Sequence, residues 1–271
     1  MSNLQSEIRA FRRETLIAID AVERGLEIAQ RRVAADDVAS KGGRDLVTAT
    51  DVAVEDAIRE LLVPSLGLPV VGEERGGEAP VDGSACWLVD PICGTRNFAS
   101  GMSLCCVNLA LVEGGQVTVA VVGDPLRDEI AVAERGRGAW ADSARRRVTT
   151  SDESRTVVVE EVKFEDPRRE HLARFMGEVV RANRWDFRSI GTTLGLPYLA
   201  AGRISAYVAF RVSPALHAAA GSLLAAEAGC ILADIDGRPW TLDSDSIVAS
   251  ANPNLHRELV ALARATAQSR E

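Results

Sequence analysis

Acidic side chains follow apolar, strand-like segments at two places in the first third of the chain. Asp90 ends one such segment, and Glu73 and Glu74 come directly after another. A further acid, Asp51, stands where a helical pattern begins. Each acid alone is as readily explained as a helix cap or a solvated loop residue. Together, acids at the ends of successive elements predict an oxygen-lined site for a hard divalent cation.

The residues after Asp90 could also bind an anion. Pro91 forces an extended exit from the strand, and a helix could begin at Gly94 and Thr95. Free backbone N–H groups and the helix dipole make such a beginning a favourable place for a phosphate. A cation held by Asp90 would then face the phosphate. The alternative is that Asp90 and Thr95 only cap a turn.

The elements that must position these residues mix helices and strands. Helical periodicity extends to about residue 33 and again over 51–62, with a flexible loop expected at 41–43. Strand-like segments follow at 68–72, 86–90, 104–112, 116–123 and 129–133. Beyond about residue 142, strands are expected at 156–162, 206–210, 230–233 and 247–250, and helices at 168–182, 192–201, 214–228 and from 254.

This order of elements predicts a layered α/β or α+β architecture. The antiparallel hairpin pattern comes first and the alternation of strands and helices comes later. We therefore expect one unit, 1–271, with two packed lobes. The first lobe, about 1–145, carries the acidic motifs, and the second covers about 146–271.

The composition is that of an ordinary globular protein, with 46% hydrophobic and 26% charged residues. Because the net charge is −8, we expect no binding to nucleic acid or to an anionic membrane. The five cysteines follow no regular spacing, which predicts reduced thiols. No signal peptide and no run of the ~20 apolar residues that span a bilayer is visible, so a cytoplasmic location is expected.

The motifs resemble, in order and spacing, those of the inositol monophosphatase superfamily. The resemblance covers nearly the whole chain and rests on 45–51 with Glu55, Gly72-Glu73-Glu74, DPICGTRNF at 90–98, ERGRGAW at 134–140, RSIGT at 188–192 and LHAAAG at 216–221. It implies an α+β fold, a layered αβαβα sandwich of the inositol monophosphatase/fructose bisphosphatase type. It also implies Mg²⁺-dependent, lithium-sensitive cleavage of a small phosphomonoester by a homodimer.

Roles in cation binding follow from the resemblance position by position. Glu73, Asp90 and the Ile92 carbonyl would bind the first metal ion. Glu74 matches the acid beside the metal-binding glutamate and is a candidate catalytic residue.

The resemblance also implies roles toward water and phosphate. Asp51 and Thr95 would orient the attacking water, and Asp51 could add a further metal ligand. The backbone amides of Gly94 and Thr95 would hold the phosphate. The protein would thus supply positioning and charge stabilisation.

Two metal-binding positions depart from the family's pattern. The family's aspartate in DPIDGT is Cys93 here, and the aspartate in its WDxAAG segment is His217, preceded by Leu216 instead of tryptophan. Both aspartates bind the family's second metal, so the resemblance places Cys93 near His217. A sugar-binding acid also has no counterpart. Ala209 or Phe210 occupies that neighbourhood, which argues against a polyol such as inositol as substrate.

Three interpretations of Cys93 and His217 are open. In the first, they bind Zn²⁺ or another ion such as Mn²⁺, with Asp90, and hydrolysis continues with an altered second site. In the second, they form a thiol site with an aspartate for acyl or thioester transfer or acid–base rearrangement. In the third, the second metal is lost and the protein is a weak phosphatase or a binding protein. We favour the first, because acids gathered without a counter-ion repel one another.

Overall fold

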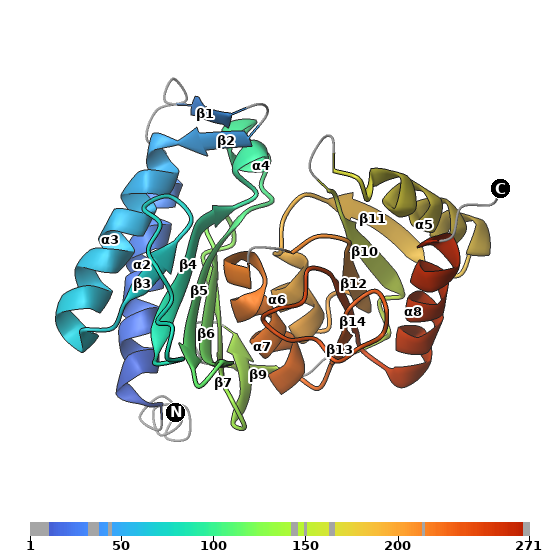
Figure 1. Ribbon diagram of the computed structural model, residues 1–271. Coiled ribbons are helices and arrows are strands. Elements are labelled where there is room, and N and C mark those ends of the chain that lie inside the picture. Colours follow the sequence, from blue (N-terminus) through green and yellow to red (C-terminus); the bar gives the residue numbers. More distant parts are fainter. Residues whose placement is uncertain are drawn as a thin grey trace.

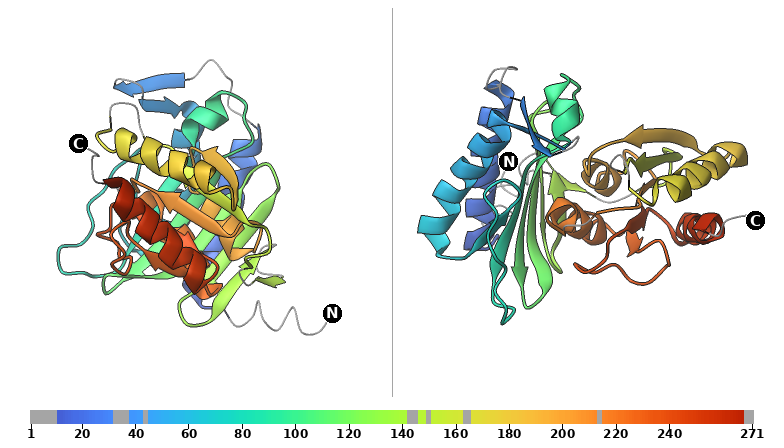
Figure 2. Two further views of the ribbon diagram at one scale, coloured as in Figure 1. Left: turned by 90° about the vertical axis from the view of Figure 1, so that its right-hand side faces the viewer. Right: turned by 45° about the horizontal axis from the view of Figure 1, so that its top comes forward.

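The fold consists of five layers, in the order helix, sheet, helix, sheet, helix (Figures 1 and 2). The computed structural model describes residues 11–31, 38–42, 45–141, 146–148, 151–162, 166–212 and 215–267. The expected α+β fold, a layered αβαβα sandwich, is confirmed. None of the helices in these described ranges is long and apolar enough to cross a membrane.

The first sheet has seven strands in the order β3-β4-β5-β6-β7-β8-β9. Only β3 and β4 run parallel, and every other neighbouring pair is antiparallel. The bounds are β3 Val70–Gly72, β4 Cys86–Cys93, β5 Cys106–Glu113, β6 Gln116–Asp124, β7 Glu129–Glu134, β8 Gly138–Ala141 and β9 Arg146–Val148. All five strands expected in this region are present, and β8 and β9 are additional.

Both faces of this sheet are buried, which explains why its central strands read as continuous apolar runs. The helices α2 (Arg13–Arg31) and α3 (Ala49–Leu66) cover one face (Figure 1). Large side chains fill that layer, among them Trp87, Leu109, Leu111 and Val121. The helix α7 (Ala219–Glu227) covers the other face, where the strands present small residues such as Ala110, Ala120 and Ala133.

The second sheet has five strands in the order β11-β10-β12-β14-β13. Parallel neighbours flank β10, whereas β14 runs antiparallel to both of its neighbours. The bounds are β10 Thr156–Glu160, β11 Asp186–Ile190, β12 Ala206–Ala209, β13 Ile231–Ala233 and β14 Ile247–Ser250. The helices α6 (Gly195–Ala200) and α7 lie between the two sheets, and α5 (Arg169–Ala182) and α8 (Pro253–Ala267) form the outer layer (Figure 2).

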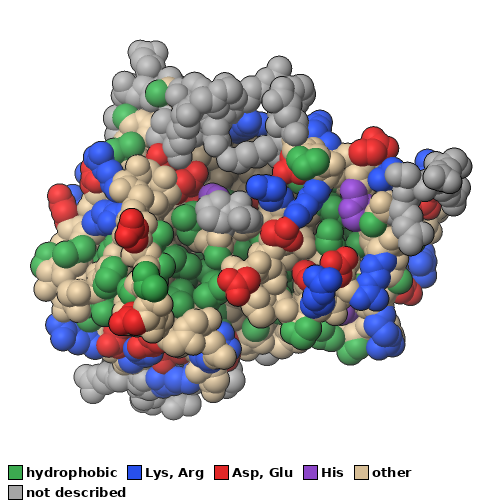
Figure 3. Space-filling model, in the orientation of Figure 1, with side chains coloured by type: hydrophobic (Ala, Val, Ile, Leu, Met, Phe, Trp, Pro, Cys, Tyr) green, Lys and Arg blue, Asp and Glu red, His purple; other side chains and the backbone are tan. Residues whose placement is uncertain are grey.

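Charged side chains of both signs are interspersed on the outer α5 and α8 side of the molecule (Figure 3). Ion pairs there include Arg184–Glu258 at 3.3 Å and Arg181–Glu178 at 2.5 Å. Exposed pairs of this kind contribute little to stability. On the described part of this side, opposite charges therefore neutralise one another locally.

Two local expectations are wrong near the N-terminus. The flexible loop expected at 41–43 is instead part of a small hairpin, because β1 (Val38–Gly42) pairs with β2 (Asp45–Thr48); Gly43 lies outside the described residues. The second helix begins at Ala49, two residues before Asp51. Thr48 is its N-cap, so Asp51 is the third helical residue and not the cap.

The helix expected over 214–228 is also interrupted. A 3₁₀ turn, η1 (Ala215–His217), comes first, and α7 starts only at Ala219. No side chain caps α7, so the alanine-rich sequence carries no signal for this boundary. His217 therefore lies on a turn at the entrance to the helix; Pro214 is outside the described residues.

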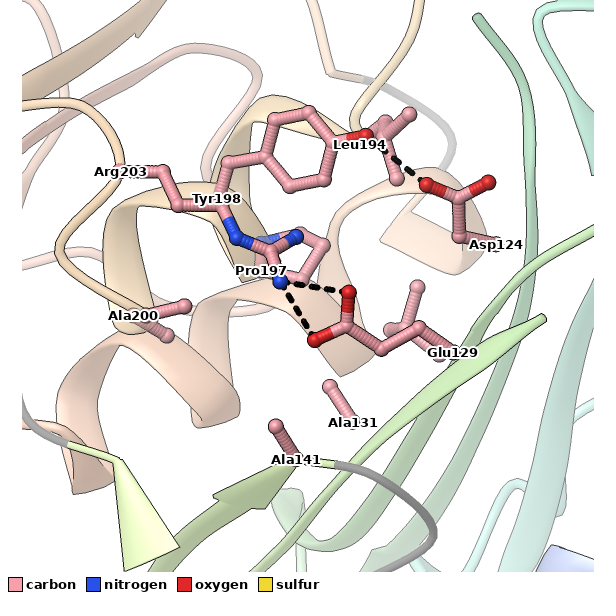
Figure 4. Close-up of a pocket in the computed structure, with 11 residues that line it drawn as sticks. Asp124, Glu129, Ala131, Ala141, Leu194, Pro197, Tyr198, Ala200 and Arg203 are labelled. Carbon is pink, nitrogen blue, oxygen red and sulfur yellow. Dashed lines mark hydrogen bonds and ion pairs between the residues drawn. The ribbon is translucent and has the colours of Figure 1, made fainter. Parts of the chain in front are cut away.

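Two polar contacts connect α6 and the turn after it to the first sheet (Figure 4). The Tyr198 hydroxyl donates to Asp124 Oδ2 at 2.8 Å, and Arg203 Nη2 lies 2.5 and 2.6 Å from the Glu129 carboxylate oxygens. The Arg203 guanidinium also lies 5.0 Å from the Tyr198 ring centroid. These contacts cross the joint that we predict between the two lobes.

Candidate functional site

A cleft of about 190 Å³ lies between the two sheets at the end of β4. Seven of the predicted site residues line it: Glu73, Asp90, Ile92, Cys93, Gly94, Thr95 and His217. Asp51 contacts the cleft through Thr95. Glu74 is not among the lining residues, so its predicted catalytic role gains no support from the geometry.

A β-bulge in β4 determines which side chains reach the cleft. In the pairing with β5, Asp90 lies opposite Asn108 and Cys93 lies opposite Cys106, so β4 carries one extra residue between them. In a regular strand, residues three positions apart point to opposite faces. The bulge turns both Asp90 and Cys93 toward the cleft. Pro91 lies within the bulge, where a missing N–H is tolerated.

Asp90, Cys93 and His217 together form a candidate cation site. One donor atom from each lies within 4.8 Å of the others. His217 Nδ1 is 2.7 Å from Asp90 Oδ2. Asp90 Oδ1 is buried and has no hydrogen-bond partner in the described residues, which is costly for a carboxylate oxygen. A cation would satisfy that oxygen, and a carboxylate, thiolate and imidazole set fits Zn²⁺ better than Mg²⁺.

The acidic cleft affects the ionisation of His217. Burial lowers the pKa of His217, but the Asp90 carboxylate, with smaller contributions from Glu73 and Glu160, raises it to about 9. In the metal-free protein an imidazolium therefore balances part of the negative charge. A cation that takes His217 as a ligand must displace its proton.

The Cys93 thiol is held at the floor of the cleft. Its Sγ lies 3.0 Å from Thr193 Oγ1 and accepts the Thr193 backbone N–H at 3.3 Å. The neighbouring Cys106 thiol, burial and the Asp90 charge raise the pKa of Cys93 well above its ordinary value. Without a compensating cation, Cys93 is a protonated thiol and a poor nucleophile.

Asp51 and Thr95 meet at the edge of the cleft. Thr95 Oγ1 donates to Asp51 Oδ1 at 3.0 Å and lies 3.1 Å from the Ile92 carbonyl oxygen. Asp51 Oδ2 accepts the Thr48 backbone N–H at 2.9 Å, which completes a capping box. Burial raises the pKa of Asp51, although hydrogen bonds from Thr48 and Thr95 oppose the shift.

Gly94 makes the turn from β4 into the short helix α4 (Thr95–Ala99). Its φ of 99° is readily adopted only by glycine, and a Cβ there would lie 2.8 Å from the Leu104 carbonyl oxygen. No side chain caps α4, so the first backbone N–H groups have no such acceptor in the described structure. This arrangement agrees with the phosphate position expected at Gly94 and Thr95.

Glu55 positions the acidic loop and received no role from the sequence. Its buried carboxylate accepts the backbone N–H groups of Glu74 at 2.7 Å and Arg75 at 3.1 Å, and Arg59 Nε at 2.8 Å. A Cβ on Gly72 would lie 2.0 Å from Glu55 Oε1. The sequence does carry a sign of this role, because Glu55 stands one helical turn after Asp51 and therefore lies on the same face of α3.

The opposite wall of the cleft was missed by the sequence reasoning. Glu160 ends β10, Glu161 comes directly after it, and Arg211 follows β12. Burial raises the pKa of Glu160 to about 8, and its carboxylate accepts the Tyr207 hydroxyl. Arg211 Nε lies 3.4 Å from Asp166 Oδ2. Charged groups of both signs therefore face the predicted metal residues.

Neither Ala209 nor Phe210, the two residues expected near the sugar-binding position, lines the cleft. Phe210 points into the core, where its ring lies 4.6 Å from His171 and 5.3 Å from Phe175. Ala209 is fully buried on the other face of β12. The next residue, Arg211, lines the cleft and presents a guanidinium there.

Comparison with known proteins places the chain in one family. The Inositol monophosphatase family model matches residues 5–268. An inositol-1-monophosphatase of Mesorhizobium japonicum is 36% identical over 230 residues, 82% of this chain and 84% of the relative. Nus factor SuhB of Pasteurella multocida is 34% identical over 223 residues, which cover 81% of this chain and 83% of the relative. The solved structure of the extragenic suppressor protein suhB of Bartonella henselae matches with a TM-score of 0.84 at 25% identity. The match covers 93% of this chain and 99% of the suhB chain. The chain therefore belongs to the inositol monophosphatase family.

Proposed function

We propose that this protein hydrolyses a small phosphomonoester with the help of divalent cations, and that Asp90, Cys93 and His217 form its altered second cation site. The carrying observation is the set of three donors within 4.8 Å, beside a buried Asp90 oxygen that has no partner in the described chain. Buried polar atoms in proteins are normally hydrogen-bonded, so a cleft that no longer bound a cation would be expected to pair that oxygen with a protein donor.

The first cation site would use oxygen donors only. Glu73, Asp90 and the Ile92 carbonyl line the same cleft, and such a set suits Mg²⁺. The second site would take Zn²⁺ or Mn²⁺ through Cys93 and His217. Cations bound there would activate water and offset the charge that develops on the phosphoryl group.

The protein's own groups would position water and phosphate. Because Thr95 donates its hydroxyl proton to Asp51, its oxygen remains free to accept a proton from the attacking water. Asp51, whose pKa is raised by burial, would receive a proton through Thr95. The amides of Gly94 and Thr95 would bind the phosphate oxygens.

Charged side chains on the opposite wall limit the leaving group. Glu161 and Arg211 both line the cleft. A neutral polyol such as inositol offers no counter-charge to either side chain, whereas a leaving group with its own charge could pair with Glu161 or with Arg211, which already lies 3.4 Å from Asp166. We therefore propose a charged, non-inositol phosphomonoester as substrate.

The reverting variant Cys93→Asp/His217→Asp tests the altered site. A panel of phosphate esters is assayed with Mg²⁺, Mn²⁺ and Zn²⁺, with Cys230→Asp as the control because Cys230 lies outside the cleft. We expect the reversion to raise Mg²⁺-dependent kcat/KM by roughly tenfold or more, the scale that ligand surroundings produce at metal sites. Full activity of the wild type with Mg²⁺ alone, unchanged by reversion, would show that this account of the second site is wrong.

A thiol-dependent reaction is the second candidate, favoured by the Asp90–His217 hydrogen bond beside Cys93. The raised pKa of Cys93 and the protonated state of His217 count against it, because neither a thiolate nor a general base is present. This candidate requires rapid labelling of Cys93 by iodoacetamide at neutral pH and loss of all activity in Cys93→Ala. Slow labelling with retained activity would eliminate it.

A catalytically weak binding protein is the third candidate. The name Nus factor SuhB, borne by several relatives, does not name an enzymatic activity. A folded wild-type protein that hydrolyses no ester of the panel with any of the three cations would support this candidate over the other two.

A further inference from the structure

Cys106 faces Cys93 across the antiparallel strands β4 and β5. The two residues are directly opposite one another in the pairing, at the first position after the β4 bulge. Opposite residues in an antiparallel pair have Cα atoms about 4.5–5.5 Å apart, and a disulfide spans about 4.4–6.8 Å between Cα atoms. The backbone therefore already has the separation that a disulfide needs.

Both thiols also point to the same place. The Thr193 hydroxyl oxygen lies 3.0 Å from Cys93 Sγ and 3.9 Å from Cys106 Sγ. The Cys106 thiol is close enough to raise the pKa of Cys93. The two sulfur atoms therefore lie side by side on the same face of the sheet.

The other three cysteines lack this arrangement. Cys86 is paired with Val112 in the same ladder. Cys105 packs in a separate small cluster with Ile92 and Phe98. Cys230 lies beyond α7, in the other part of the fold. Cys93 and Cys106 are thus the pair of thiols that the fold sets opposite one another.

We propose that a hydroperoxide oxidises Cys93 and Cys106 to a disulfide beneath the cleft. Cys93 lines the cleft and is 7% exposed, so a small peroxide can reach its sulfur. Because the Cys93 thiol is largely protonated, only its small thiolate fraction attacks hydrogen peroxide, so the step is slow; it breaks the O–O bond and gives a sulfenic acid and one water. Cys106 then attacks that sulfur, the S–S bond forms, and a second water leaves. The two thiols lose two electrons and two protons, and the peroxide is reduced.

The disulfide would remove a donor from the candidate cation site. Cys93 Sγ, bonded to Cys106, could no longer serve as a thiolate ligand beside Asp90 and His217. This consequence rests on the proposed function, but the disulfide itself does not. Its formation is measured on the metal-free protein by mass and thiol count, so failure of either proposal can be recognised separately.

The test treats the native, metal-free protein with hydrogen peroxide and then blocks the remaining thiols in denaturant. We expect the thiol count to fall from five to three, since one disulfide consumes two. Trypsin cleaves after Arg75, Arg96 and Arg127, so the disulfide should join peptides 76–96 and 97–127. A reductant should separate them and restore all five thiols.

Matched variants identify the partners, because each of the two peptides contains a second cysteine. Cys86→Ser and Cys105→Ser should both keep the joined peptides, whereas Cys106→Ser and Cys106→Ala should both lose them. Circular dichroism of each variant shows that it is folded. Five free thiols after treatment of the wild type, or joined peptides that persist in folded Cys106→Ser, would overturn the proposal.

Discussion

Asp90 is the side chain on which both proposed cation sites depend. One of its oxygens lies 2.7 Å from His217 Nδ1, and the other is buried with no partner in the described residues. Buried carboxylate oxygens are normally satisfied, so the unpaired oxygen marks the position where a cation has most to gain. The bulge in β4 turns Cys93 toward the same cleft, so a cation bound there would meet a thiol as well as a carboxylate.

The mixed donor set leads to a prediction for Zn²⁺ affinity. Cys93→Ser should weaken Zn²⁺ binding by at least roughly tenfold, because a neutral hydroxyl is a much poorer ligand than a thiolate. Cys230→Ser should leave the affinity unchanged. Calorimetric titration of the metal-free, reduced proteins measures both. Equal affinities of the wild type and Cys93→Ser would exclude the thiol from the site.

The Thr95 hydroxyl gives a second prediction for a single residue. Thr95→Val keeps the shape of the side chain but removes the hydroxyl that donates to Asp51 at 3.0 Å. If that pair positions water, kcat should fall by about a hundredfold or more with little change in KM. Thr95→Ser should retain most of the activity. A rise in KM with kcat unchanged in Thr95→Val would instead indicate a role in substrate binding.

At the scale of elements, the contact between α3 and the turn after β3 places the acidic loop. Gly72→Ala would put a Cβ 2.0 Å from Glu55 Oε1. The Glu55 carboxylate cannot move cheaply, because it is buried and accepts several hydrogen bonds. We expect a loss of about 1–3 kcal/mol in the free energy of unfolding, together with lower activity.

A glycine in α5 provides the matched control. A Cβ on Gly177 would meet nothing closer than 3.5 Å, so Gly177→Ala should stabilise the protein by about 0.5–1 kcal/mol. Urea denaturation of both variants measures whether the free energy of unfolding falls in Gly72→Ala and rises in Gly177→Ala. A Gly72→Ala protein as stable and active as the wild type would refute the positioning role of Glu55.

The sequence allowed prediction of the elements that have a clear pattern. The apolar strands β4 to β7 and the amphipathic helices α2 and α5 were expected because burial imposes a period on their residues. The strand β11 was not expected, since it is an edge strand with mostly exposed side chains. The break before α7 left no recognisable signal in the sequence because α7 has no capping side chain.

The site was predictable only in part, for a related reason. Motif residues such as Glu73 and Asp90 could be chosen because each stands beside a chain segment with a clear pattern. The opposite wall comes from the ends of β10 and β12, and only the packing of the second sheet brings it to the cleft. Whether Phe210 or Arg211 faces that cleft depends on a shift of one residue in strand phase, which composition does not encode.

At the scale of the whole molecule, the cleft exists only while the two sheets keep their relative position. Its walls come from β4 on one side and from the end of β10, the residues after β12 and η1 on the other. The helices α6 and α7 lie between the sheets and hold them apart (Figure 2). Polar contacts across this joint should therefore influence both stability and the geometry of the cleft.

The ion pair between Arg203 and Glu129 gives the last prediction. Their side chains are 29% and 13% exposed, so the pair is partly buried (Figure 4). Arg203→Ala should lower the free energy of unfolding by about 1–2 kcal/mol at neutral pH. Arg184→Ala, whose pair with Glu258 is exposed on both sides, should cost little.

The effect of Arg203→Ala should also depend on pH. Burial alone would raise the pKa of Glu129, but Arg203 and then Arg127 lower it below its ordinary value. An acid whose pKa is lowered by folding stabilises the protein above its unfolded pKa, and that contribution is lost as pH falls through the folded pKa. The difference between wild type and Arg203→Ala should therefore shrink in acid, as urea denaturation at neutral pH and at roughly pH 3 would measure. A difference that stays constant would mean that Arg203 acts through packing against Tyr198 and not through the charge of Glu129.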